Sequence, residues 1–270
     1  MLTVALSLIA AVVLMPFFWL VTTAFKSNEE IFTRNMVWLP AQLRWENFAI
    51  GWNALKPFSF LMFFKNSFVL VAICLVGCLV SCTLVAYGFS RIQFRFRNGL
   101  FVVLLSTMML PSQITMIPMY IIWANLKQVN TYVPLALPWF LGSPFYIFLL
   151  RQFMSGIPKE LDEAAVIDGC SKFWIYYRII LPLTKPAIFT VAVFAFSEVY
   201  DDFLGPLIYL SDPKLYTVSM AMRLFFSNDT LPQYGPTMAM ALVCMLPVLL
   251  LFIFAQKALI QGIATTGLKA

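Results

Sequence analysis

Several long runs without a charged residue constrain the fold of this chain more than any other feature. A helix that crosses a bilayer needs about 20 mostly apolar residues, and five uncharged runs are at least that long. A sixth run, Pro186–Leu210, has a similar length but contains Glu198, Asp201 and Asp202. The composition agrees, since 61% of the residues are hydrophobic and 11% are charged. The sequence therefore predicts an all-α, polytopic membrane protein with six transmembrane helices.

No long internal repeat or polar linker separates one part of the chain from another, so we expect a single domain over residues 1–270. The first apolar run has no basic residue before it and is longer than the core of a typical signal peptide. It is therefore interpreted as a retained helix. The six expected spans are residues 2–25, 66–90, 98–126, 130–151, 186–210 and 232–257, with a long loop over 155–184.

Basic residues indicate which side of the membrane each loop occupies. Six spans put both termini on one side, and termini inside would leave ten Lys and Arg residues in interior segments and eight in exterior ones. The short loop RIQFRFR carries three arginines, and short loops follow the positive-inside rule best. Both termini are therefore predicted to be cytoplasmic. The net charge of +6 is interpreted as a topology signal rather than a nucleic-acid surface, because no clustered basic face accompanies it.

Three of the five cysteines lie in the second expected span. Cys74, Cys78 and Cys82 are four residues apart, which stacks them on one helix face. A metal site is not expected there, because the chain has no histidine and this segment has no carboxylate. Together with Gly77 and Ser81, these small residues are interpreted as a surface for close helix packing.

The loop over residues 155–184 is rich in charge and in helix formers. Glu160, Asp162 and Glu163 fall in a predicted first helical turn, where the helix dipole favours acidic side chains. Gly169 can take the left-handed conformation that ends a helix, and a second short helix follows it. Physical chemistry alone leaves two interpretations open: a solvated amphipathic linker, or a short knob that docks on another protein.

The same loop fits the spaced pattern E-A-A-x3-G-x9-I-x-L-P at every fixed position. This pattern resembles the signature loop of permease subunits in binding-protein-dependent ABC importers. The stretches FLLRQFMSGIPKELDEAAVIDG, LPSQITMIPMY and TTAFKSNEEIF resemble the carbohydrate branch of that family, of the maltose-importer type, and the resemblance extends over nearly the whole chain. The fixed positions are Glu163, Ala164, Ala165, Gly169, Ile179, Leu181 and Pro182.

The resemblance implies that the loop is a coupling helix, which docks in a cleft of a cytoplasmic ATPase subunit. Carried over by position, Glu163, Ala164, Ala165 and Gly169 are coupling residues, and Asp168 agrees with the carbohydrate branch. The resemblance also implies two copies of that ATPase, a second similar permease, an extracytoplasmic solute-binding protein and a place in the bacterial inner membrane. ATP and Mg would bind to the ATPase subunits, because this chain lacks the G-x-x-x-x-G-K-[ST] phosphate loop. No catalytic residue is predicted here.

The fifth expected span contains three acidic residues at membrane depth. Glu198 lies about 18 Å along it at about 1.5 Å per residue, and Asp201 and Asp202 follow on the face that also carries Gly205. One interpretation is that these residues and Tyr200 line a translocation cavity, where carboxylates accept hydrogen bonds from sugar hydroxyls. The alternatives are that they pair with basic groups of a partner or lie in an outer vestibule. The family often has W-N-D/E-F here, and this chain has YDDF, which puts a typical neutral sugar in doubt.

The third expected span has three polar residues between two prolines. Ser112, Gln113 and Thr115 lie between Pro111 and Pro118. Prolines free backbone carbonyls, which is tolerated where a helix borders protein or a wet cavity. A second candidate for the translocation pathway and a purely structural kink explain this pattern equally well.

Three functions remain open at this point. The first is a permease subunit of an ATP-driven ABC importer for a sugar, oligosaccharide or polyol, which works by alternating access and is not itself an enzyme. The second is the same machine for a non-sugar solute. The third is an ion-coupled secondary transporter that uses Glu198, Asp201 and Asp202; it leaves the charged loop unexplained.

Overall fold

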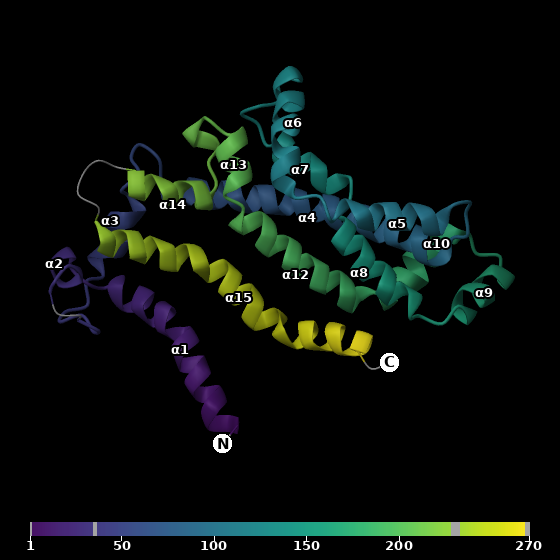
Figure 1. Ribbon diagram of the computed structural model, residues 1–270, viewed down its shortest axis with the longest axis horizontal. Coiled ribbons are helices and arrows are strands. Elements are labelled where there is room, and N and C mark those ends of the chain that lie inside the picture. Colours follow the sequence, from purple (N-terminus) through teal and green to yellow (C-terminus); the bar gives the residue numbers. More distant parts are fainter. Residues whose placement is uncertain (1, 35–36, 228–232, 268–270) are drawn as a thin grey trace. The chain divides into compact units, whose positions relative to one another are not determined.

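The computed structural model describes residues 2–34, 37–227 and 233–267, and Figure 1 shows their helices in chain order. Every regular element in these ranges is helical, which confirms the all-α prediction. The elements are α1 (Leu2–Thr23), α2 (Asn28–Ile31), α3 (Glu46–Trp52), α4 (Phe60–Arg91), α5 (Arg97–Thr107), α6 (Ser112–Asn125), α7 (Val133–Phe140), α8 (Pro144–Ser155), α9 (Glu160–Ile167), α10 (Lys172–Ile175), a π-helical turn (Tyr176–Ile180), α11 (Leu181–Leu183), α12 (Lys185–Asp201), α13 (Leu204–Tyr209), a 3₁₀ turn (Pro213–Leu215), α14 (Val218–Ser227) and α15 (Tyr234–Gly267).

Four helical segments of the described chain are long and apolar enough to cross a membrane. They lie in α1, in α4, in α7 and α8 together, and in α15. A fifth span results if Lys172–Leu183 and Lys185–Asp201, which meet at a bend of 76°, count as one. The expected third span is divided into α5 and α6, because Pro111 has no backbone N–H and disfavours helical geometry in the residue before it. The count of six spans stays a prediction.

The chain forms two compact units. The first comprises residues 1–67 and 216–250, and the second comprises residues 68–215 and 251–270. The single-domain organisation expected from the sequence stays a prediction.

The first unit has an aromatic core and a polar loop after α1. Phe60, Phe63 and Met240 are fully buried in this core. In the loop, the amide of Asn47 donates hydrogen bonds of 2.9 Å to the carbonyl oxygens of both Ala24 and Lys26. These contacts attach α3 to the end of α1.

Glu30 organises the same loop through hydrogen bonds with the backbone. Its carboxylate accepts from the Ser27 N–H at 2.9 Å and from the Ala41 N–H at 3.0 Å, and the Ser27 hydroxyl caps α2 in return. The backbone N–H groups of Ser27 and Ala41 hold the pKa of the Glu30 carboxyl below its ordinary value. The stabilisation is therefore complete above about pH 4.3, the ordinary value for glutamate, and is lost as the pH falls through the lowered pKa.

Replacing Glu30 with glutamine is expected to loosen this loop, because the uncharged amide makes weaker hydrogen bonds than the carboxylate. Amide exchange at Ala41, measured by hydrogen exchange at pH 7, should accelerate about two- to tenfold, the range that corresponds to one net hydrogen bond. Glu29→Gln, which alters the neighbouring exposed acid, should leave the rate unchanged. Equal rates for the wild type and both variants would contradict the prediction.

The second unit is built around the carboxyl-terminal half of α4, with α8 packed against both α5 and α12 (Figure 1). Cys74, Cys78 and Cys82 are buried in it, and a Cβ atom added to Gly77 would meet the ring of Phe140. The small-residue face of α4 thus allows close approach of the α7–α8 segment, as the sequence predicts. In the part of the chain that the structure describes, no group of cysteine and carboxylate side chains is arranged to hold a metal ion.

Candidate functional site

The charged loop folds as a helix, a glycine turn and a second helix. α9 ends where the Cys170 N–H donates to the Ala165 carbonyl at 2.9 Å and the Gly169 N–H donates to Val166 at 3.0 Å. This is the pattern of a glycine-terminated helix, and Gly169 has a φ of +80° that side chains disfavour. The hydroxyl of Ser171 then caps α10 by accepting from the Trp174 N–H at 3.2 Å.

The five candidate coupling residues do not share one environment. Glu163, Ala164, Asp168 and Gly169 are exposed on the surface of the loop. Ala165 is only 5% exposed and packs into the core of the second unit. Ala165 therefore supports α9 from beneath, while the other four residues face outward.

An exposed apolar surface lies beside these residues, and sequence reasoning missed it. Val166 is 57% exposed and Ile167 is 86% exposed. Both follow directly after the E-A-A segment, and helical spacing separates Ile167 from Ala165 by about 200°. That spacing is a signal that identifies Ile167 as outward-facing once Ala165 is placed in the core.

Arg91, the last residue of α4, holds the amino-terminal part of the loop. Its guanidinium forms a 3.2 Å ion pair with Asp162 and donates hydrogen bonds to the carbonyl oxygens of Met154 at 2.6 Å and Ile157 at 2.7 Å. The Arg91 side chain is only 3% exposed. One buried cation therefore joins the end of α4, the end of α8 and the first turn of α9.

Two further contacts fasten the other end of the loop to the same face of α4. The Tyr87 hydroxyl donates to the Lys172 carbonyl at 2.9 Å, and the hydroxyl groups of Thr83 and Tyr176 lie 2.9 Å apart. Thr83, Tyr87 and Arg91 are four residues apart, so they lie along one side of the helix. The residues that they contact in the loop and at the end of α8 lie at least 63 positions further along the sequence. No local pattern therefore marks Thr83, Tyr87 and Arg91 as contacts of the loop.

A separate cavity of about 500 Å³ lies at the carboxyl-terminal end of α12. Glu198, Asp201 and Asp202 all line it, together with the indole of Trp139. The structure thus brings together the three carboxylates that the sequence analysis selected.

Tyr200 is placed differently from its acidic neighbours. It is 4% exposed and its ring stacks on Phe196 at 5.6 Å and lies 6.0 Å from the ring of Phe68. The described lining of the acidic cavity does not include Tyr200. Its position is that of a core residue which supports α12.

The expected span over residues 186–210 is interrupted in the structure. α12 ends at Asp201, and Asp202 has an extended backbone. The Asp202 carboxylate accepts a 3.0 Å hydrogen bond from the Gly205 N–H, which opens a new helix, α13. Pro206 has no N–H to continue the earlier helix, so Gly205 lies beyond the break and not on the helix that carries Glu198.

Glu198 has a partner that the sequence did not indicate. The hydroxyl of Tyr146, in α8, donates a 2.7 Å hydrogen bond to its carboxylate, and Tyr146 is 3% exposed. The pair lies 52 residues apart in the sequence, which hides it from any periodic pattern. Tyr146 therefore fixes the carboxylate at the edge of the cavity.

The candidates in the third expected span lie elsewhere. Gln113 and Thr115 are exposed on α6 and do not line the acidic cavity. The side chain of Ser112 lies outside the described residues. Within the described chain, the structure does not bring these candidates together with the acidic ones.

Comparison with known proteins identifies a family and relatives that resemble this chain. Residues 80–265 match the family model described as "Binding-protein-dependent transport system inner membrane component". The sn-glycerol-3-phosphate transport system permease protein UgpE of Pectobacterium atrosepticum is 32% identical over 93% of this chain and 90% of its own. The arabinooligosaccharides transport system permease protein AraQ of Bacillus subtilis is 30% identical over 99% of this chain and 95% of its own.

A solved structure has the same fold. One chain of a bacterial ABC transporter involved in the import of the acidic polysaccharide alginate superimposes with a TM-score of 0.83 at 19% identity, over 94% of both chains. The family match covers more than half of the chain, including the charged loop and the three acidic residues of the cavity. This chain therefore belongs to the binding-protein-dependent transport system inner membrane components, the permease subunits of ABC importers.

Proposed function

We propose that this permease carries a sugar, oligosaccharide or polyol, and that α9 is the helix through which an ATPase drives it. The observation that carries the proposal is the construction of the loop. Its outer surface presents Glu163, Val166 and Ile167, while Arg91 and Tyr87 fasten its base to α4. A solvated linker needs no such buried attachment. A helix that passes movement from an ATPase to α4 does need one.

The complete transporter would contain more than this chain. A second, similar permease would form the other half of the pathway, and two copies of a cytoplasmic ATPase subunit would bind ATP and Mg. An extracytoplasmic binding protein would deliver the solute. We place both termini and α9 on the cytoplasmic side of a bacterial inner membrane, in agreement with the arginine-rich 91–97 loop.

The mechanism follows from the contacts of the loop. Closure of the ATPase dimer would displace α9, and the buried ion pair of Arg91 with Asp162 would pass that displacement to α4 and to the end of α8. α8 also packs against α12, which carries the acidic cavity. Movement at the loop would thus change access to the cavity, as alternating access requires.

The acidic cavity supports the proposed class of solute. Carboxylate oxygens accept hydrogen bonds from hydroxyl groups, and the lining also includes the aromatic residue Trp139. None of the described lining residues is basic. This surface disfavours an anionic solute, although UgpE is named for a phosphate ester and the structural relative imports an acidic polysaccharide.

The test is to replace Glu163 with alanine in the assembled, purified transporter and to measure ATP-driven uptake and solute-stimulated ATPase activity in proteoliposomes. We expect both to fall about thirtyfold or more, because the docked Glu163 would form a buried, hydrogen-bonded charge pair, and truncating one partner of such a pair costs about 2–5 kcal/mol. The Glu163 side chain is exposed, so the subunit itself should fold normally.

Glu46→Ala serves as the matched control, since Glu46 is an exposed acid in a helix outside the loop. It should retain wild-type uptake. Wild-type coupling in Glu163→Ala would overturn the role of α9, and uptake that persists without any ATPase would instead identify an ion-coupled transporter. Uptake of a non-sugar solute in preference to carbohydrates would overturn the substrate class alone.

A further inference from the structure

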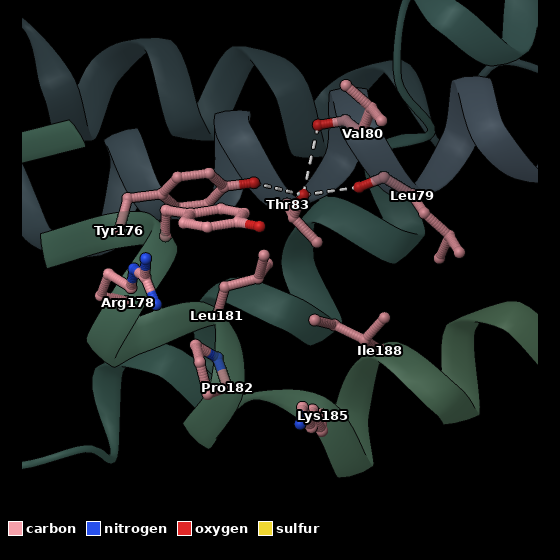
Figure 2. A pocket seen from close by; sticks show the side chains of 10 residues that line it. Leu79, Val80, Thr83, Tyr176, Arg178, Leu181, Pro182, Lys185 and Ile188 are labelled. Carbon is pink, nitrogen blue, oxygen red and sulfur yellow. Dashed lines mark hydrogen bonds between the residues drawn. The ribbon is translucent and has the colours of Figure 1, made fainter. Parts of the chain in front are cut away.

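The second unit contains another cavity, of about 570 Å³, that shares no lining residue with the acidic one. Figure 2 shows that Leu79 and Val80 border it from α4, and that Leu181 and Ile188 border it from the segment opposite. These residues make its wall largely apolar. Nothing in the proposed transport cycle uses this cavity.

The hydroxyl groups of Thr83 and Tyr176, which lie in the wall, already have hydrogen-bond partners within the protein. The Thr83 hydroxyl donates to the Leu79 carbonyl at 2.6 Å, so the Tyr176 hydroxyl, 2.9 Å away, donates to Thr83 (Figure 2). Neither hydroxyl therefore requires a ligand as its hydrogen-bond partner. The wall suits an apolar chain.

Two cations complete the lining. Arg178 and Lys185 both border the cavity, and both are exposed. In the described ranges, neither forms an ion pair within the protein, and Arg178 lies only loosely over the ring of Tyr177, at 5.9 Å. The cavity thus combines an apolar wall with positive charge that has no internal counter-ion.

The cavity lies where the chain passes from the loop into a membrane-spanning segment. The helical path bends by 76° between Lys172–Leu183 and Lys185–Asp201, and lining residues come from both sides of this bend. On α4, Val80 is 11 residues before Arg91, which places it about 16 Å along the helix at about 1.5 Å per residue. The apolar wall therefore extends to bilayer depth from a basic edge at the end of the span.

We propose that this cavity is a binding site for an anionic phospholipid. The phosphate lies between Arg178 and Lys185, and one acyl chain packs over Leu79, Val80 and Ile188. Basic pockets between transmembrane helices bind such headgroups because the cations, placed at the interface, gain an anionic partner. The proposal is independent of the transported solute and of the coupling role of α9.

The experiment uses the assembled transporter, extracted in detergent and delipidated, and measures the retention of added lipid by native mass spectrometry. The probes are phosphatidylglycerol, which is anionic, and phosphatidylcholine, which is zwitterionic, with matched acyl chains. We expect phosphatidylglycerol to bind the wild type preferentially. Removing both cations in Arg178→Gln/Lys185→Gln should weaken it about thirtyfold, since each basic residue contributes about 1 kcal/mol near a lipid surface.

A second variant tests the acyl-chain part of the site. Val80→Trp keeps both cations and fills the cavity from an exposed position, so it should also reduce phosphatidylglycerol binding. The control Arg95→Gln/Arg97→Gln removes two positive charges between the end of α4 and the start of α5, outside the cavity, and should retain the lipid.

Three outcomes would overturn the proposal. They are equal retention of the two lipids by the wild type, full retention by Arg178→Gln/Lys185→Gln, and an equal loss in the Arg95→Gln/Arg97→Gln control. An equal loss in the control would indicate only a diffuse attraction between the anionic lipid and the positive charge of the protein. Full retention by both cavity variants indicates that the lipid binds elsewhere on the transporter. Because lipid retention is read without transport, failure here leaves the importer function untouched, and failure of coupling leaves the lipid site untouched.

Discussion

Replacing Arg91 with alanine is expected to uncouple ATP hydrolysis from transport. The change removes the partner of Asp162 and takes away the guanidinium hydrogen bonds to the carbonyl oxygens of Met154 and Ile157. Removing one member of a buried ion pair costs about 3–5 kcal/mol, and we expect the lower end because Asp162 is 21% exposed. The number of solute molecules moved per ATP, measured in proteoliposomes, should fall about a hundredfold.

Two variants separate this effect from a general loss of charge or of folding. Arg95→Ala removes an exposed arginine four residues further on and should transport normally. Arg91→Lys keeps the charge beside Asp162 but not the planar fork that reaches both carbonyl groups, so it should lie between the wild type and Arg91→Ala. If Arg91→Ala assembles and transports with wild-type stoichiometry, then α4 is not the element that carries movement from the loop.

Replacing Gly205 with alanine is expected to damage the acidic cavity. A Cβ atom at this position would overlap the Asp202 carboxylate and come within 2.9 Å of the Leu135 side chain. The Asp202 carboxylate would have to leave the Gly205 N–H, which removes the hydrogen bond at the start of α13. Overpacking of this kind costs about 1–3 kcal/mol, and we expect a lower thermal unfolding temperature together with at least about tenfold weaker uptake.

Gly99→Ala is the matched control, because an added Cβ there meets nothing within 4 Å. Gly99 lies inside α5, where alanine is favoured over glycine by about 0.5–1 kcal/mol. This control should therefore unfold at the wild-type temperature or slightly above it. Identical unfolding and uptake for Gly205→Ala and the wild type would show that α13 tolerates the displacement.

The family resemblance proposed from the loop motif is confirmed by the match over residues 80–265. That motif was readable because its parts are local: a glycine at a fixed distance, small residues at the centre and acids in the first turn. The same locality explains why the helix–glycine–helix structure was predicted correctly around Gly169. The roles of the candidate coupling and pathway residues remain predictions, which the substitutions above test.

Sequence by itself determined that this chain is helical, membrane-embedded and equipped with a charged loop, because hydropathy, helix dipoles and glycine conformations act over a few neighbouring residues. Only the tertiary structure decided that Ala165 faces the core, that Arg91 anchors the loop, and that Tyr146 holds Glu198. It also decided that the fifth span breaks at Asp202, through a side-chain hydrogen bond that competes with the helix. Contacts across 52–71 residues depend on how helices pack, and no periodic pattern in the sequence records that packing.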